Sequence, residues 1–109
     1  MNFTPFLAEL VAEGRKTQTR RLAAVGALCP YRVGLVYGVV PGRGKTSVCH
    51  IRITSVREEA AGDISWRDAR AEGYRSPWHF IAAFARVYGL TDADATLARV
   101  WRIEFTLER

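Results

Sequence analysis

The sequence predicts an α+β fold in which a small mixed β-barrel carries flanking helices. Segments with helical spacing and segments with strand alternation follow one another in the order helix, strands, helices, strand. No repeat or linker interrupts the 109 residues, so we expect a single domain over residues 1–109. Closing the sheet into a barrel would remove exposed strand edges, which favours closure in so short a chain.

The first predicted element is a helix that begins after Thr4 and stops at Gly14. Threonine is a good N-cap, Pro5 suits the first helical position, and glycine suits a left-handed stop. Apolar residues at helical spacing give this helix one apolar face, made of Phe3, Phe6, Leu7, Leu10 and Val11. We expect that face to pack against the sheet.

Three strands are predicted further along the chain. Residues 35–40 and 48–53 are apolar and β-branched, and the glycines and proline of residues 41–45 indicate a turn between them. Residues 99–108 alternate between apolar and polar side chains, which is typical of a half-buried strand. Residues 22–30 lack periodicity and are predicted to form a loop.

Two helices are predicted between the second and third of these strands. A short one covers residues 63–71 and ends near Gly73. In the longer one Ser76 is the N-cap, Pro77 is the first residue, and Gly89 is the stop. Its aromatic residues, including Trp78 and Phe84, recur at helical spacing and are interpreted as core residues.

Residues 16–21, KTQTRR, are the most informative stretch of the chain. In an extended segment Thr17, Thr19 and Arg21 share one face, whereas Lys16 begins on the other, so a bend is needed to bring Lys16 to Thr19. An amine beside a hydroxyl can act as base and nucleophile where burial or a positive neighbour lowers the lysine pKa. The alternative interpretation is a solvated basic strand at the surface.

Composition narrows the class of ligand. The net charge is +5 and arginine far outnumbers lysine. Guanidinium groups bind phosphates in a two-pronged fork and stack on bases, so the composition favours nucleic acid, nucleotides or acidic substrates as partners.

No apolar run approaches membrane-spanning length and no signal peptide is evident, so we expect a cytoplasmic protein without a membrane partner.

Cysteine and histidine indicate no metal site. Cys29 and Cys49 have no metal-ligand spacing and are predicted to be free thiols. His50 and His79 lack the companions that a zinc site requires. We therefore predict neither a metal nor any other cofactor.

Several motifs together resemble the ASCH domains (activating-signal-cointegrator homology). They are the N-terminal helix, the run Gly-Arg-Lys-Thr-Gln-Thr-Arg-Arg at residues 14–21, Tyr-Arg-Val-Gly at 31–34, Glu-Gly-Tyr at 72–74, and the last strand at 100–105. This resemblance spans nearly the whole chain and implies a PUA-like fold, a small mixed β-barrel with flanking helices. ASCH domains are linked to RNA, and small bacterial members include amidohydrolases that remove the acyl group from N4-acetylcytidine.

The resemblance also implies a catalytic set. In those hydrolases a lysine, a threonine three residues later and a downstream glutamate fall on Lys16, Thr19 and Glu72. We assign substrate contacts to four further residues, Arg21, Thr17, Arg20 and Tyr37. Thr19 would attack the acyl group with Lys16 as base, or Glu72 would activate a water while Thr19 only binds; the residue types allow both.

The leading hypothesis is therefore a metal-independent, monomeric amidohydrolase of N4-acylated cytosine nucleosides. Two alternatives use the same basic cleft. In the first, a non-catalytic module binds RNA, which contacts the side chains of Arg15, Arg20, Arg21 and Lys45 through its phosphates and stacks on Tyr37 or Trp66. In the second, an ASCH protein cleaves RNA with a lysine as base.

Overall fold

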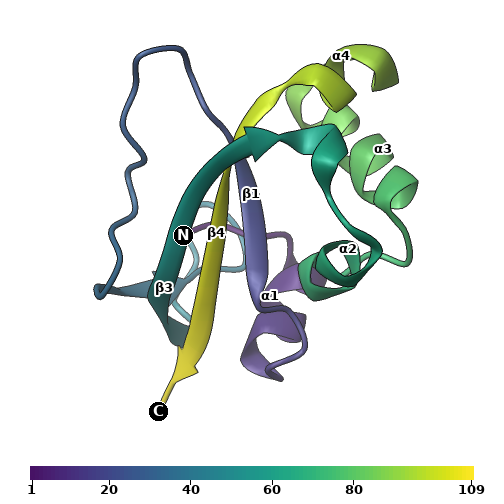
Figure 1. Ribbon diagram of the computed structural model, residues 1–109. Helices are drawn as coiled ribbons and strands as arrows, with labels where there is room; N and C mark the ends of the chain where they lie inside the picture. Colours follow the sequence, from purple (N-terminus) through teal and green to yellow (C-terminus); the bar gives the residue numbers. More distant parts are fainter.

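A computed structural model describes all 109 residues (Figure 1). The chain forms four strands, four α-helices and one short 3₁₀ helix. In chain order they are α1 (Pro5–Ala12), β1 (Gln18–Leu22), β2 (Val36–Val39), β3 (Cys49–Ala60), η1 (Ala61–Asp63), α2 (Trp66–Glu72), α3 (Pro77–Tyr88), α4 (Asp92–Leu97) and β4 (Arg99–Glu108). The α+β class predicted from the sequence is confirmed.

The sheet has the strand order β1-β4-β3-β2, and every neighbouring pair is antiparallel. It is an open sheet, so the predicted closure into a barrel is wrong. Closure would require a ladder between the edge strands β1 and β2, and these two strands do not pair. The helices gather on one side of the sheet, and the long connection after β1 extends away from them (Figure 1).

The first three residues occupy the free edge of β2. The Met1 amino group donates to the carbonyl of Gly38 at 2.9 Å, and Asn2 forms an isolated parallel bridge with Val40. From the other edge of the sheet, Nη2 of Arg21 donates to the Asn2 carbonyl at 2.7 Å. A side-chain hydrogen bond therefore connects β1 to this segment, where a closed barrel would have a backbone ladder.

β3 and β4 form the long central pair of the sheet. β4 has the predicted bounds and alternation, with Ile103 and Phe105 buried. β3 runs seven residues beyond the predicted end at Ile53, and its register with β4 shifts between Ile53 and Ser55. Such a bulge changes which residues face the core, which interrupts the strict alternation that sequence analysis relies on.

The helix ends follow local capping chemistry. The hydroxyls of Thr4, Ser65 and Ser76 accept from the backbone of α1, α2 and α3, and Gly73 and Gly89 end α2 and α3 in the left-handed conformation. α2 begins three residues later than predicted, because residues 61–63 form the 3₁₀ helix and Ser65 is the cap. α4 was not predicted, since it is only six residues long and buries Ala95 alone.

The buried apolar side chains form two clusters. One lies among the helices and includes Phe80 and Phe84, and the other lies between α1 and the sheet and includes Phe3 and Ile103. The prediction that Trp78 belongs to the core is wrong: it is 62% exposed and stacks edge-on against Trp66. None of the helices combines the length and the apolar character that crossing a membrane requires.

Candidate active site

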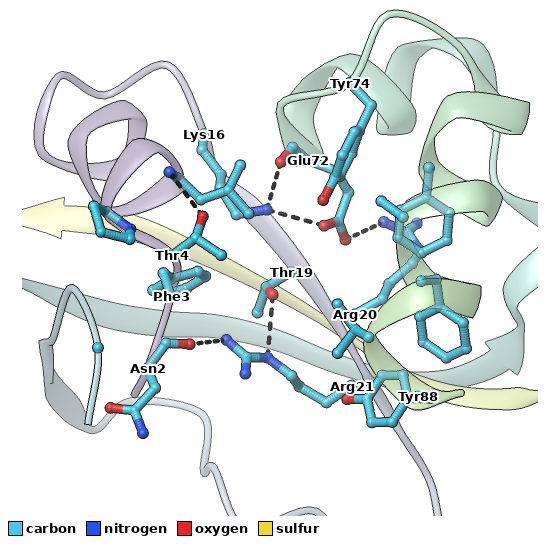
Figure 2. A pocket seen from close by; sticks show the side chains of 17 residues that line it. Asn2, Phe3, Thr4, Lys16, Thr19, Arg20, Arg21, Glu72, Tyr74 and Tyr88 are labelled. Atoms are coloured by element: carbon cyan, nitrogen blue, oxygen red, sulfur yellow. Dashed lines mark hydrogen bonds and ion pairs between the residues drawn. The ribbon is translucent and has the colours of Figure 1, made fainter. Parts of the chain in front are cut away.

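A cavity of about 380 Å³ lies where the two apolar clusters meet (Figure 2). Its apolar walls come from the segment before α1, from α1, from the connection between α2 and α3, and from α3. They include the aromatic rings of Phe3, Tyr74, Phe80, Phe84 and Tyr88. Its polar groups come from β1 and the residues just before it, and from the end of α2. They are Lys16, Thr19, Arg20, Arg21 and Glu72.

The turn between α1 and β1 brings Lys16 to the cavity. Gly14 has a positive φ of 76°, and the backbone amides of Arg15 and Lys16 both donate to the Leu10 carbonyl, which folds the chain back against the end of α1. β1 begins only at Gln18, so strand alternation does not apply to Lys16. This is the bend that the sequence required for Lys16 and Thr19 to line one cavity.

Glu72 is the last residue of α2 and is held against Lys16. The Lys16 ammonium donates to the Glu72 carboxylate at 2.9 Å and to the Glu72 backbone carbonyl at 2.5 Å. Both residues are buried, with 2% and 3% of their surfaces exposed. Burial lowers the pKa of Lys16 below its ordinary value; the charge of Glu72 opposes this change, and the charges of Arg21 and Arg20 add to it.

Arg20 lies on the opposite face of β1 from Thr19 and is enclosed by acidic groups. Its side chain is fully buried, and it donates to Glu59 at 2.8 Å, to Asp68 at 3.2 Å and to the second oxygen of Glu72 at 2.9 Å. A further bond goes to the Gln18 side chain. Four of the five guanidinium donors are therefore used inside the protein. Arg20 lines the cavity, and these contacts hold it against Glu72 and the other carboxylates.

Thr19 and Arg21 form the other polar part of the cavity. Nε of Arg21 donates to the Thr19 hydroxyl at 3.3 Å, and its guanidinium lies 4.9 Å from the centre of the Phe3 ring. Arg21 has no carboxylate partner, so its positive charge is not neutralised by a neighbouring acid. In Figure 2 Thr19 lies between Lys16 and Arg21. A hydroxyl beside the unpaired charge of Arg21 is placed where negative charge on oxygen would be stabilised.

The structure brings together Lys16, Thr19, Arg21 and Glu72, and leaves two predicted contact residues outside the cavity. Thr17 is exposed, and its backbone bonds to Ala71 and Phe105. Tyr37 packs edge-on against Tyr31, and its hydroxyl accepts from the backbone amide of Arg32. Neither side chain lines the cavity.

Sequence analysis missed most of the cavity wall. Phe80, Phe84 and Tyr88 form a stripe at a spacing of four residues on a helix whose aromatic residues were interpreted as core. Phe80 and Phe84 are in the core, Tyr88 packs against it, and all three also border the cavity. Tyr74 directly follows the Glu-Gly pair, and that position was the available signal. Burial raises the pKa of Tyr74, and the charge of Glu72 adds to this rise.

Metal-binding groups do not converge anywhere in the chain. No group of three or more histidine, cysteine, aspartate or glutamate side chains is arranged to hold an ion. The acidic residues nearest the cavity, Glu59, Asp68 and Glu72, are instead paired with Arg20. Cys29 and Cys49 are free and half-buried.

No protein-family model matches this sequence, and no curated protein matches it. Solved structures do. An ASCH domain from Lactobacillus crispatus superposes with a TM-score of 0.76 at 23% identity, over 94% of this chain and 70% of that one. A protein from Enterococcus faecalis superposes with a TM-score of 0.71 at 20% identity, over 94% of this chain and 69% of that one.

The ASCH protein of Zymomonas mobilis gives a TM-score of 0.64 at 14% identity, over all of this chain and 65% of that one. At these identities the likeness establishes the fold. The chain therefore has the ASCH-domain fold, as the sequence motifs predicted. This places the buried lysine, threonine and glutamate on that fold.

Proposed function

We propose that this protein is an amidohydrolase that removes the acyl group from N4-acetylcytidine or related N4-acylated cytosine nucleosides. One observation carries the proposal: the buried amine of Lys16 is held by Glu72 at a cavity that Thr19 and Arg21 also line. The resemblance of the lysine, threonine and glutamate positions to those of small ASCH amidohydrolases supports the same reaction.

The cavity suits a flat, uncharged ligand of nucleoside size. Its volume of about 380 Å³ falls within the range typical of small-molecule sites. Aromatic rings of Tyr74, Phe80 and Tyr88 offer faces and edges to a pyrimidine. An acylated cytosine would be held by these apolar walls while its amide carbonyl meets the polar groups of β1.

Lys16 fits the role of base because burial disfavours its charged form, an effect that the charge of Glu72 opposes. Burial lowers its pKa, and a neutral amine has two N–H donors and one lone pair. The two hydrogen bonds to the Glu72 carboxylate and carbonyl would use both donors. The lone pair then remains available to accept a proton from a group in the cavity.

In the proposed reaction Lys16 accepts the proton of the Thr19 hydroxyl, and the oxygen attacks the acyl carbon. Arg21 stabilises the resulting oxyanion, and the Lys16 ammonium returns a proton to N4 as the C–N bond breaks. Water then releases the acid from Thr19 with Lys16 again as base. Lys16 makes no hydrogen bond to Thr19 in the structure; such catalytic contacts often tighten only when substrate binds.

Glu72 is assigned to orienting Lys16. Its two carboxylate oxygens accept from two different buried cations, Lys16 and Arg20. A carboxylate held in this way fixes the position of the amine nitrogen, as the third group of a catalytic triad orients the base. The alternative, in which Glu72 activates a water and Thr19 only binds, predicts a different response to substitution at Thr19.

The direct test is to incubate the purified protein with N4-acetylcytidine in the presence of EDTA and to measure cytidine by chromatography. We expect steady release of cytidine. No release by the folded protein, or release that stops with EDTA and returns with zinc, would contradict the proposal.

The matching variant is Lys16→Met, which keeps the length of the buried side chain and removes the amine. We expect kcat to fall by at least about 10²-fold, as for loss of a general base. Lys45→Met is the control, because Lys45 is the other lysine of the chain and is exposed outside the cavity. Circular dichroism melting of both variants separates loss of chemistry from loss of folding, and an active, folded Lys16→Met would exclude Lys16 as base.

A further inference from the structure

A second groove, of about 440 Å³, lies beside the cavity and is strongly basic. Seven residues line it, and three of them are arginines, Arg15, Arg70 and Arg75. The others are Phe6, Leu10, Gly73 and Tyr74, so no acidic side chain borders the groove. The catalytic assignment does not account for this arrangement, and Arg70 and Arg75 lie outside the sequence motifs.

The three guanidinium groups have almost no partners of opposite charge. Arg70 and Arg75 form no ion pair, and Arg15 has only a long contact of 3.5 Å to Glu13, which is exposed to solvent. Exposed contacts of this kind contribute little. By contrast, Arg20 and Arg52 are closely paired with carboxylates. Like charges gathered around one hollow repel each other and are stabilised by an anion that bridges them.

The fold brings the three arginines together from separate segments. Arg15 follows α1, Arg70 lies in the last turn of α2, and Arg75 follows the left-handed residue Gly73. A guanidinium offers parallel N–H donors that match the oxygens of a phosphate. The groove is thus lined by several such donors, which is the chemistry of a phosphate site.

The groove and the proposed active site share a lining residue. Tyr74 borders both hollows, Glu72 of the cavity is followed by Gly73 of the groove, and Leu7 and Phe6 of α1 lie on the two sides. A ligand with its base in the cavity could place its sugar along Tyr74. Its phosphate would then lie in the groove among the arginines.

We propose that the groove formed by Arg15, Arg70 and Arg75 binds the phosphate group of the substrate, which is therefore a nucleotide. This inference rests on the proposed function and names its substrate class. The phosphate belongs either to a mononucleotide or to an RNA chain. The two sources share the same chemistry at the groove, and the length of the ligand distinguishes them.

The first experiment measures binding and does not depend on hydrolysis. Cytidine and cytidine 5′-monophosphate are titrated by calorimetry against the wild type and the Arg70→Gln/Arg75→Gln double variant. We expect the monophosphate to bind the wild type at least about tenfold more tightly than cytidine, as charge-assisted bonds to two guanidinium groups imply. The double variant should lose that preference, and rising salt should weaken it.

Arg57→Gln is the matched control, because Arg57 is an exposed arginine of β3 outside both hollows. It should keep the full preference for the monophosphate. Equal binding of cytidine and its monophosphate by the wild type, or an unchanged preference in the double variant, would overturn the phosphate site.

The second experiment compares kcat/KM for N4-acetylcytidine, its 5′-monophosphate and a short RNA that carries the modified base internally. If kcat/KM is higher for the monophosphate than for both the nucleoside and the RNA, the substrate is a mononucleotide. If kcat/KM rises further with the RNA, the substrate is the polymer. Hydrolysis with equal kcat/KM for substrates with and without a phosphate would overturn the assignment of the groove as a phosphate site. It would not contradict the proposed function. Arginine-dependent binding of the monophosphate without hydrolysis of any of the three would instead overturn the proposed function.

Discussion

At the scale of single residues, three cations from one six-residue segment have three different surroundings. Lys16 is buried against one glutamate, Arg20 is buried among three carboxylates, and Arg21 is half-buried with none. Desolvation favours the neutral form of Lys16, and the acidic partners of Arg20 make it a structural group. Only Arg21 keeps free charge at the cavity, so it is the one suited to stabilising an oxyanion.

Substitution of Thr19 separates a nucleophile from a binding residue. Thr19→Ser keeps the hydroxyl and loses a methyl, whereas Thr19→Val keeps the shape and loses the oxygen. We expect kcat of the serine variant to exceed that of the valine variant by at least about a hundredfold, within the range of nucleophile and general-base effects. Single-turnover assays of the two folded variants measure this ratio. Equal rates for the serine and valine variants would favour a water activated by Glu72.

The pH dependence of kcat/KM reports the ionisation of Lys16. A base must be neutral, so activity should rise with pH through an apparent pKa below the ordinary lysine value of 10.5, because burial lowers the Lys16 pKa. The charge of Arg21 also lowers that pKa, so Arg21→Gln should move the midpoint to higher pH and reduce the maximal rate. The pH profiles of kcat/KM for the wild type and Arg21→Gln check this shift. A flat profile between about pH 6 and about pH 9 would remove Lys16 from the role of base.

At the scale of elements, the end of α2 decides where the Glu72 carboxylate lies. Gly73 follows with φ 104°, and a β-carbon there would lie 3.0 Å from the Leu10 side chain and 3.2 Å from that of Leu7. Gly73→Ala should therefore cost about 1–2 kcal/mol of unfolding free energy for the left-handed backbone alone. It should also shift Glu72 and Lys16, and lower kcat/KM by about tenfold or more.

Gly89→Ala provides the matched control for this prediction. Gly89 ends α3 with φ 67°, and an added β-carbon would meet nothing within 4 Å. It should show a similar loss of stability, measured by urea unfolding, with kcat/KM per folded molecule unchanged. If both variants keep full activity, the end of α2 does not control the geometry of the site.

At the scale of the whole molecule, Arg20 connects the two halves of the fold. From β1 it reaches Glu59 on β3 and both Asp68 and Glu72 on α2, which links the sheet to the helices beside the cavity. These ion pairs are largely buried. The pKa of Asp68 is lowered: burial opposes this change, but the hydrogen bond from Gln18 and the charges of Arg102 and Arg20 outweigh it.

Arg20→Met should destabilise the protein by about 3–5 kcal/mol, because three carboxylates lose their buried partner. Equilibrium unfolding of wild type and variant in guanidinium chloride measures this difference in unfolding free energy. Arg52→Met removes an arginine whose ion pair with Glu108 is exposed, and its unfolding midpoint should match the wild type. A loss for Arg20→Met no larger than that for Arg52→Met would show that the network does not hold the fold together.

Local chemistry made much of the fold predictable from the sequence. Thr4, Ser76 and Gly89 mark helix ends through hydrogen bonds to residues a few positions away, and the alternation of residues 99–108 reports one buried face of a strand. The late start of α2, the unpredicted α4 and the bulge after Ile53 escaped prediction. Each depends on packing against distant segments or lacks a periodic pattern.

By itself the sequence determined the α+β class, the ASCH-like motifs, and the choice of Lys16, Thr19 and Glu72 as candidate groups. Only the tertiary structure decided that Lys16 is buried and that Arg20 forms a buried ion pair with Glu72. It also decided that the sheet stays open and that aromatic residues of α3 line the cavity. The physical reason is distance along the chain. Lys16 and Glu72 are separated by 56 positions, and their burial and charge follow from contacts that no local pattern encodes.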